Sequence, residues 1–438
     1  QITGTGVLAT AQTAGFDNVA ASAALLNWNG SGWSGLNSTN NAIETDKGYF
    51  LYIRGERSKG ITGTTTNSSA TTLRSKGLVY QGDQPAINFN SNNFYLVGNV
   101  YPSAINFQLL ERTGGVSNVF YTWDSKKLNG SSLGAYQTFS ATNNFNCILS
   151  GGSYTLGQPN TTIESGQAFF VQTNASPGTI ALKESAKIIS NNGNLGFRPA
   201  ARPATVESRL YSASDKNMLD AAVVVFDAAY SKEINAEDAP KLGNPGANFS
   251  IETKGKILSV EGTAPVTDND IIQFRMWNLQ QQTYTLEMVV TNVHAEGISA
   301  VLEDAYLKTS TVVQMNTSTV VNFAVDSNAG SSAASRFMIV FRKTINLPAA
   351  VNEYVIAPNP IEDGVINLQF KNKASGKYLV NISSNAGQSI KSMFIFHGGG
   401  TNNYLVTLPL TLAHGSYQVE IIAPGKTKKI KKFLVNKQ

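Results

Sequence analysis

The side chains that could carry out chemistry are few and lie far apart along the chain. The single cysteine, Cys147, excludes an internal disulfide and a multi-cysteine metal site, and the three histidines are too widely spaced to indicate a histidine metal centre. Two short acidic segments, Asp268–Asp270 and Glu303-Asp304, could offer hard oxygen ligands to Ca²⁺. The other ligands of a calcium loop do not follow at a recognised spacing. We therefore predict polar turns at these positions, with no metal and no cofactor.

Three segments fit the letters of catalytic motifs but lack the elements that those motifs need. Gly130–Gly134 fits G-x-S-x-G, yet its neighbours predict a turn rather than a strand-to-helix elbow. Gly4–Ala9 fits a dinucleotide fingerprint without a preceding strand, and His294–Glu296 fits H-x-E without a later P-C-x-x-C. Glu111 and Asp124 could be a glycosidase acid and base, but their spacing does not indicate a pair. We predict that the protein is not an enzyme.

Aromatic side chains are the one candidate ligand-binding feature. Trp28, Trp33, Tyr49 and Tyr52 lie in a region rich in Gly, Asn and Ser. Exposed rings of this kind can stack on sugars, while neighbouring polar groups bond to hydroxyls. The alternative is that these rings belong to a strand core, because aromatic residues supply much of the buried area of a β-sandwich. The core interpretation is the stronger of the two.

The elements that must position these residues are predicted to be short strands. Only 14% of the 438 residues are charged, 42% are hydrophobic and 38 are glycine, a balance that favours strands and turns over long helices. Apolar or alternating runs bounded by turn residues include 119–123, 271–277 and 415–422. The chain contains no run of about 18 apolar residues, so the sequence predicts no transmembrane helix. The sequence predicts an all-β chain of several β-sandwich domains, the first two jelly-roll-like.

Three domains are expected from the length and from two polar or proline-containing breaks. The first spans 1–189 and contains a faint internal repeat, the second spans 204–344 and the third spans 350–438. The start of the chain, Gln1–Gly4, has neither an initiator Met nor the pattern of a signal peptide. We therefore expect a processed chain or part of a longer protein.

The basic character of the chain is confined to the third predicted domain. Residues 349–438 contain ten lysines, no arginine and only four acidic residues, whereas the whole chain has a formal net charge of +5. Six of these lysines lie in the last thirteen residues. Because recognition of phosphates and bases relies largely on the arginine fork, the lysines indicate a solvated strand face rather than a nucleic-acid surface. We expect no nucleic-acid partner.

Several motifs of the third domain occur in the order and spacing of one known family. They are the P-N-P of Pro358, Asn359 and Pro360, the G-x-Y-x-V of Gly415, Tyr417 and Val419, and the closing Lys431, Lys432, Phe433, Leu434 and Val435. In this respect the domain resembles the type A C-terminal sorting domain of the type IX secretion system of Bacteroidetes. The resemblance implies an immunoglobulin-like sandwich of about seven strands.

The resemblance also implies a location and partners. In that family the domain directs a folded passenger through the periplasm and across the outer membrane, and a sortase then removes it and links the passenger to lipopolysaccharide. The expected partners are the outer-membrane translocon, the substrate-carrying outer-membrane barrel and the sortase, with surface polysaccharide or lipopolysaccharide at the attachment step. We expect the last strand to be the handle, with Lys431 and Lys432 pairing with acidic groups and Phe433–Val435 making apolar contacts.

The rest of the chain is similar to passengers of such surface proteins. The similar segments are Val97–Ile105, Glu164–Val171, Asp238–Leu242 and Arg336-Phe337. They imply a secreted, non-enzymatic adhesin or surface-display module, including one used in gliding motility. Two alternatives remain open: the chain is the non-catalytic C-terminal part of a larger secreted hydrolase, or it is a carbohydrate-binding module.

Overall fold

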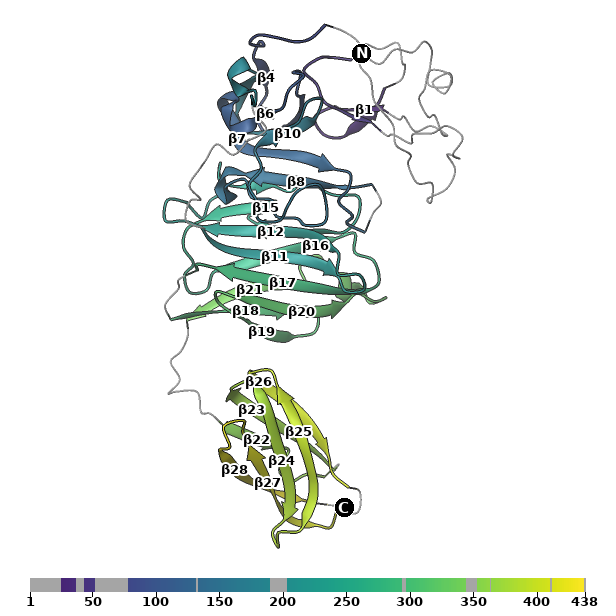
Figure 1. Cartoon of the computed structure of the whole chain (residues 1–438), viewed down its shortest axis with the longest axis vertical. Helices are drawn as coiled ribbons and strands as arrows, with labels where there is room; N and C mark the ends of the chain where they lie inside the picture. The colour runs from purple at the N-terminus through teal and green to yellow at the C-terminus, as the bar shows by residue number, and fades with distance from the viewer. Residues whose placement is uncertain are drawn as a thin grey trace, which may run out of the picture. The chain divides into compact units, whose positions relative to one another are not determined.

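Strands make up nearly all of the regular structure. The computed structural model describes residues 25–36, 43–51, 78–130, 133–189, 203–293, 297–343, 353–362, 364–409 and 412–436. Apart from strands, these residues form only short 3-10 turns, η2 (Phe107–Leu109), η3 (Ala141–Asn143), η4 (Glu184–Ala186) and η5 (Ala329–Ser332). Figure 1 shows the strands gathered into several sheets, which confirms the all-β, multi-sandwich fold. No helix among these residues is long and apolar enough to cross a membrane.

The chain divides into two compact units, residues 1–344 and residues 345–438. The predicted domains 1–189 and 204–344 both fall in the first unit, and the predicted domain 350–438 corresponds to the second. The three-domain division itself stays a prediction, because the first unit is held together by a strand that both of its halves share, as described below.

The first half of unit 1 is built around one long strand. β10 pairs with β4, β5 and β7, and β8 extends the sheet beyond β7. A small sheet in the order β2-β1-β3 and the pair β6-β9 accompany it. The strands are β1 (Leu25–Trp28), β2 (Trp33–Gly35), β3 (Tyr49–Leu51), β4 (Ile87–Phe89), β5 (Phe94–Gly98), β6 (Ile105–Asn106), β7 (Glu111–Asp124), β8 (Ala135–Ser140), β9 (Thr162–Ile163) and β10 (Ala168–Ala181).

Glycine allows β7 and β10 to remain paired across an irregular register. The register shifts between Val171 and Gly178, and at this point β7 runs through Gly114 and Gly115. A Cβ on Gly115 would lie 2.1 Å from the Ser176 carbonyl oxygen, so only glycine fits there. The bulged pairing carries both strands far beyond the short apolar runs that the sequence indicates.

The second half of unit 1 is one large sheet that curls around a single core. Its order is β19-β18-β21-β16-β14-β15-β12-β11-β17-β20, with β13 paired to β15. The two end strands, β19 and β20, are joined by a tight turn in which the Gln314 amide donates to Thr319 Oγ1 at 2.8 Å. The strands are β11 (Ala204–Ser212), β12 (Met218–Phe226), β13 (Ala239–Pro240), β14 (Asn248–Thr253), β15 (Lys256–Thr263), β16 (Ile271–Trp277), β17 (Thr283–Thr291), β18 (Ile298–Asp304), β19 (Thr309–Val313), β20 (Ser318–Ala324) and β21 (Phe337–Lys343).

Strand β12 joins the two halves because both of its faces are buried. All nine of its residues are buried. Ala222, Val224 and Phe226 belong to the core inside the curled sheet. The side chains between them point to the opposite face of the strand. Val223 and Val225 on that face belong to a second cluster, which includes Tyr121 of β7. The nearly continuous apolar run of β12 is the sequence pattern of such a doubly buried strand.

Unit 2 is a seven-stranded sandwich with its own core. One sheet has the order β22-β23-β26 and the other β25-β24-β27-β28. Inward residues of all seven strands form one hydrophobic cluster that includes Tyr378, Val419 and Phe433. The strands are β22 (Glu353–Ala357), β23 (Val365–Lys373), β24 (Gly376–Ser384), β25 (Ser389–His397), β26 (Gly400–Thr407), β27 (Gly415–Ile422) and β28 (Lys428–Val435). The strand number and the two-sheet arrangement match the immunoglobulin-like expectation.

Glu261 of β15 makes the stability of unit 1 depend on pH. Burial, reinforced by the nearby Asp238 carboxylate, raises the pKa of Glu261 from 4.5 to about 7. A raised carboxyl pKa contributes stability that is complete below the unfolded pKa and is lost as the pH rises from 4.5 to about 7. Glu261→Gln should therefore be more stable than wild type at about pH 8, with the difference disappearing at about pH 4.

This prediction can be measured by denaturant unfolding followed by tryptophan fluorescence. All four tryptophans, at positions 28, 33, 123 and 277, lie in unit 1, so the signal reports on this unit alone. Glu164→Gln, at an exposed carboxyl, is the control and should show no pH-dependent gain. A Glu261→Gln protein that is equally or less stable than wild type at every pH would contradict the prediction.

Candidate functional site

The motif residues of the last two strands lie opposite one another. β27 and β28 are antiparallel, with Gly415 opposite Val435, Tyr417 opposite Phe433 and Val419 opposite Lys431. The Tyr417 and Phe433 rings are stacked, with centroids 5.8 Å apart, and the Tyr417 hydroxyl donates to the Ala413 carbonyl at 2.7 Å. The G-x-Y-x-V and K-K-F-L-V motifs are therefore two sides of one strand pair.

The P-N-P segment, near the start of unit 2, contacts the end of the same strand. The Leu434 amide donates to Asn359 Oδ1 at 2.8 Å, and the Leu434 carbonyl accepts from the Ile361 amide at 2.8 Å. The Asn436 amide donates to the Ile361 carbonyl at 2.9 Å, which makes a short parallel bridge between Ile361 and Val435. Both prolines follow cis peptide bonds. All three motifs thus meet at β28, although the first lies about seventy residues before the last.

Sequence reasoning identified Pro358–Pro360 as a motif but did not identify what it does. Asn359 accepts the hydrogen bond from β28, and Ile361, just after the motif, is fully buried in the core. The signal available in the sequence was an asparagine between two prolines, with the apolar Ile361 directly after the second proline. Asn readily bonds to backbone groups, whereas the two prolines supply no N–H of their own.

Replacing Asn359 by alanine should loosen the end of β28. The Leu434 amide would lose its acceptor, which we expect to cost about 1 kcal/mol. Hydrogen exchange followed by mass spectrometry should show faster exchange at residues 434–436 and little change in β23 and β24. Asn402→Ala is the matched control, because this exposed side chain of β26 bonds to the Gly399 carbonyl just before its own strand and not to β28. Equal exchange in wild type and Asn359→Ala would contradict the role assigned to Asn359.

Burial divides the residues of the proposed handle into two groups. Phe433 and Val435 are 1% and 3% exposed, so they are core residues and cannot make the apolar contacts with a partner that we expected from the sequence. Leu434 is 49% exposed, and Lys432 is also exposed. Of the apolar residues in this motif, only Leu434 presents a side chain to a partner, because alternate side chains of an outer strand face opposite directions.

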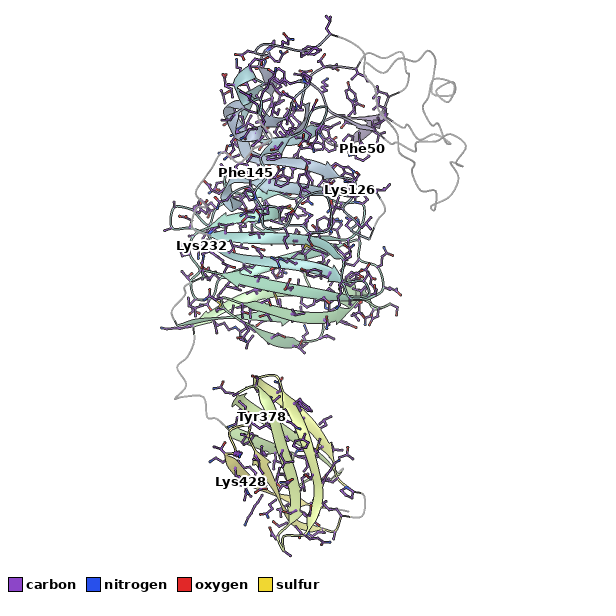
Figure 2. All side chains as sticks on the ribbon, viewed as in Figure 1. Phe50, Lys126, Phe145, Lys232, Tyr378 and Lys428 are labelled. Carbon is purple, nitrogen blue, oxygen red and sulfur yellow. The ribbon has the colours of Figure 1, made fainter. Side chains whose placement is uncertain are left out.

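The lysines of β28 make this strand positively charged. Lys428 pairs with Glu420 of β27 at 3.0 Å, and its side chain is largely exposed. Figure 2 labels Lys428 and, for comparison, Tyr378, which is buried in the core of the same unit. Hydrogen bonds from Asn381 and Lys428 lower the pKa of Glu420. This carboxylate therefore stays charged at neutral pH and already has a lysine partner. Lys429 and Lys432 add further positive charge along the strand.

The candidate ligand-binding aromatics lie in a network of edge-to-face contacts. Trp28 and Trp33 are 5.5 Å apart, and both make T-shaped contacts with Phe170, at 5.1 and 5.8 Å. Trp33 also contacts Phe50, which is labelled in Figure 2. Trp28 Nε1 donates to the Phe94 carbonyl at 2.9 Å. These contacts attach the small β2-β1-β3 sheet to β10, as the core interpretation expects.

Tyr49 and Tyr52 differ in what the structure describes. The Tyr49 hydroxyl accepts a hydrogen bond from the Glu44 amide at 2.9 Å, and Tyr49 is partly buried. Tyr52 lies outside the described residues. A sugar-binding role for the four aromatics stays a prediction that nothing in this arrangement favours.

The carboxylates considered for Ca²⁺ each have a protein partner. Asp268 accepts from the Lys343 amide at 2.7 Å, and Asp270 pairs with Lys232, labelled in Figure 2, at 2.6 Å. Glu303 pairs with Arg342. Among the described residues, no group of three or more His, Cys, Asp and Glu side chains could hold a metal ion.

Asp304 belongs to a buried ion pair with Arg336. Arg336 Nη2 lies 2.8 Å from Asp304 Oδ2, and Arg336 Nε donates to both carboxylate oxygens, at 3.0 and 3.1 Å. Arg336 Nη1 donates to the carbonyls of Ala324 and Ser331. Burial alone would raise the pKa of Asp304, but the hydrogen bonds from Arg336 lower it. The pair ties β18 and β20 to the segment that leads into β21, which is a structural role.

The catalytic candidates do not form a site among the described residues. Glu111 and Asp124 lie at opposite ends of β7, about 40 Å apart along an extended strand, whereas a glycosidase pair needs less than about 10 Å. Asp124 is buried and accepts from Ser153 and Lys126, the latter labelled in Figure 2. Ser131 and Ser132 and the segments Gly4–Ala9 and His294–Glu296 lie outside the described residues.

Other buried charges of unit 1 have partners within the protein, and one of them, Lys127, connects its two halves. Lys241 pairs with Asp220 of β12 at 2.6 Å, and the Phe249 amide donates to the same carboxylate at 2.8 Å. Lys127 follows β7, and its ammonium donates to the carbonyls of Leu128 and of Met218 in β12. Burial lowers the pKa of Lys127 to about 8. Because each of these groups has hydrogen-bond partners, their role is to hold neighbouring segments of unit 1 together. Sequence reasoning did not identify them.

Comparison with solved structures gives only weak similarities. PorZ of Porphyromonas gingivalis, a surface component of its type IX secretion system, shares 18% identity over 24% of this chain and 14% of its own, with a TM-score of 0.16. Dimeric latent PorU of the same organism shares 10% identity over 80% and 32%, and the BSP domain of a biofilm-associated protein shares 9% over 84% of each chain, both with a TM-score of 0.16. The chain thus spans less than a third of the two Porphyromonas proteins, and TM-scores this low support no conclusion. No curated protein matches the chain.

Family membership rests on a match that covers most of the chain. The model of a domain of unknown function, DUF8693, matches residues 10–341, bounds that nearly coincide with those of unit 1. Since the match extends over well more than half of the 438 residues, the chain belongs to the DUF8693 family, and unit 1 is the domain that defines it.

Proposed function

We propose that this chain is an exported cell-surface protein whose unit 2 is a sorting domain for the type IX secretion system. The observation that carries the proposal is the meeting of all three motifs at β28, through Asn359, Tyr417 and Phe433. Motifs that serve one recognition event should lie together in the fold, and here segments from both ends of the unit are joined by three backbone and side-chain hydrogen bonds. The separate core of unit 2 supports a signal that works as an independent module.

Unit 1 is, in this proposal, a non-enzymatic adhesin or surface-display module, including one used in gliding. Two observations support a non-catalytic role. The carboxylates Asp270, Glu303 and Asp304, considered for calcium, form ion pairs within the protein, and the two carboxylates considered as a glycosidase pair lie at opposite ends of β7. The proposed partners of unit 2 are the outer-membrane translocon, the substrate-carrying barrel and the sortase. Lipopolysaccharide or surface polysaccharide would be the final anchor.

The test is export in a bacterium that has a type IX secretion system. Full-length chain and a chain ending at residue 344 would be compared by surface protease accessibility and by fractionation. We expect the full chain at the surface and the truncated chain in the periplasm, still folded, because unit 1 has its own core. Native tryptophan fluorescence of the trapped protein checks its folding. Truncated protein at the cell surface would contradict the proposal.

A further inference from the structure

The two outer strands of the larger sheet of unit 2 differ sharply in how their free edges are covered. β28 is bridged by Ile361 and Asn359 at its end and carries lysines along its length. At the other side of the sheet, β25 pairs with β24 alone among the strands described. An outer strand offers unpaired N–H and C=O groups, and proteins normally protect it with lysine, proline, bulges or a covering segment.

Only the first half of β25 is protected in this way. Lys391 reaches across to the carbonyl of Thr407, at the end of β26, at 2.7 Å. The second half, Met393–His397, has no Lys, Arg, Asp or Glu and continues in regular register with β24. Its two outward side chains, Phe394 and Phe396, are 53% and 76% exposed. Two exposed phenylalanines on an unprotected edge are a recognised signature of an interaction site.

The rings belong to a larger apolar surface on the outer face of the sheet. Phe394 lies opposite Leu379 of β24, which lies opposite Ile422 of β27. Phe396 lies opposite Lys377. All of these residues are on one face, because side chains directly opposite in neighbouring strands point the same way. The result is an apolar row that begins at the β25 edge and extends across three strands.

Positive charge borders this row. The Lys377 ammonium lies 3.8 Å from the centroid of the Phe394 ring and 5.7 Å from that of Phe396. Ile422 lies opposite Lys428 at the far end. Glu420, two residues before Ile422 on β27, already bonds to Asn381 and Lys428. A second copy of this same face would bring like charges together, whereas an acidic segment would meet complementary charge.

We propose that the β25 edge at Met393–His397 accepts an extended acidic segment of a partner protein as an additional strand. Main-chain hydrogen bonds to β25 supply affinity, as in other cases of strand addition. Apolar side chains of the segment cover Phe394 and Phe396, and its carboxylates meet Lys377. The proposal does not depend on the export role of unit 2, because it concerns binding by the folded chain alone.

The test uses two short synthetic peptides and the full-length chain. In one peptide Glu alternates with Val, and in the other Lys alternates with Val. Fluorescence anisotropy should show binding of the Glu peptide, with the Lys peptide at least about tenfold weaker. Hydrogen exchange should slow at Met393–His397 when the Glu peptide is bound and stay unchanged in β28. No binding of the Glu peptide, or protection of β28 instead of β25, would overturn the proposal.

Variants distinguish binding at the β25 edge from nonspecific binding to exposed apolar residues. Phe394→Ser/Phe396→Ser should weaken Glu-peptide binding about tenfold, whereas Leu405→Ser, at another exposed apolar residue on β26 of the opposite sheet, should not change it. Lys377→Glu should reverse the preference between the two peptides. Phe394→Tyr/Phe396→Tyr should retain binding, which distinguishes loss of the rings from loss of the fold. Equal effects of the serine changes on both sheets, or concentration-dependent dimerisation in place of peptide binding, would refute the proposal.

Discussion

Replacing Arg336 by methionine is expected to destabilise unit 1 by about 3–5 kcal/mol. The change leaves Asp304 as a buried carboxylate without its cation, and it removes the donor to the carbonyls of Ala324 and Ser331. The guanidinium also lies within 5.0 Å of the ring centroids of Tyr306, Phe323 and Phe337, so its planar contacts are lost too. Denaturant unfolding followed by tryptophan fluorescence measures the effect, because every tryptophan is in unit 1.

An exposed ion pair provides the matched control. Arg342 of β21 pairs with Glu303 of β18, the residue next to Asp304, but the Arg342 side chain is mostly exposed. Arg342→Met should cost less than about 1 kcal/mol. The double variant Arg336→Met/Asp304→Leu should recover part of the loss, since no buried charge remains. If Arg336→Met and Arg342→Met cost the same, the buried pair does not have the importance given to it here.

The second large effect is expected in unit 2. Phe433→Ala should destabilise the sandwich by about 3–5 kcal/mol, because it removes a buried ring that stacks on Tyr417 and leaves a cavity between the sheets. Unit 2 contains no tryptophan, so hydrogen exchange of β27 and β28 in the full chain is the measurement. If unit 2 is the sorting domain, this variant should also lose export.

Leu434→Ala, one residue along the same strand, separates folding from recognition. Its side chain is half-exposed and its backbone hydrogen bonds to Asn359 and Ile361 remain, so stability should change by less than about 0.5 kcal/mol. Loss of export by a well-folded Leu434→Ala or Lys432→Ala chain would identify outward residues of β28 as the contact. Normal export with Phe433→Ala would contradict the requirement for a closed sandwich.

The sequence predicts strands best where alternation is clean and turns are marked. The runs 271–277 and 415–422 correspond to β16 and β27 without a change of bounds. The run 119–123 is part of a longer strand, β7, which begins at Glu111. Residues Glu111–Asn118 include two glycines and several polar residues, and their bulged pairing with β10 places them in the sheet. Tertiary contacts decided this element, and no local pattern shows them.

The candidate site could be predicted only in part. The three motifs of unit 2 were recognised from their order and spacing, but a residue pattern does not show that Phe433 and Val435 face inward while Leu434 faces outward. The role of Asn359 depends on a contact with a residue 75 positions away. Partners this far apart are set by topology, and the exposed edge of β25 became visible only once the sheet order was known.

The bridge between Ile361 and the end of β28 also determines when unit 2 can be completed. Strands β22 and β23 are synthesised first. The segment between them contains Ile361, whose backbone hydrogen bonds to the second sheet are made with residues 434–436. Contacts between residues so far apart form late, since the intervening chain must be ordered first. Until β28 has been synthesised and has emerged from the ribosome, the surface formed by Ile361 and β28 does not exist in assembled form. A secretion machinery that recognises the folded sandwich would therefore export molecules in which β28 is in place. Prematurely terminated chains that lack β28 would not be exported.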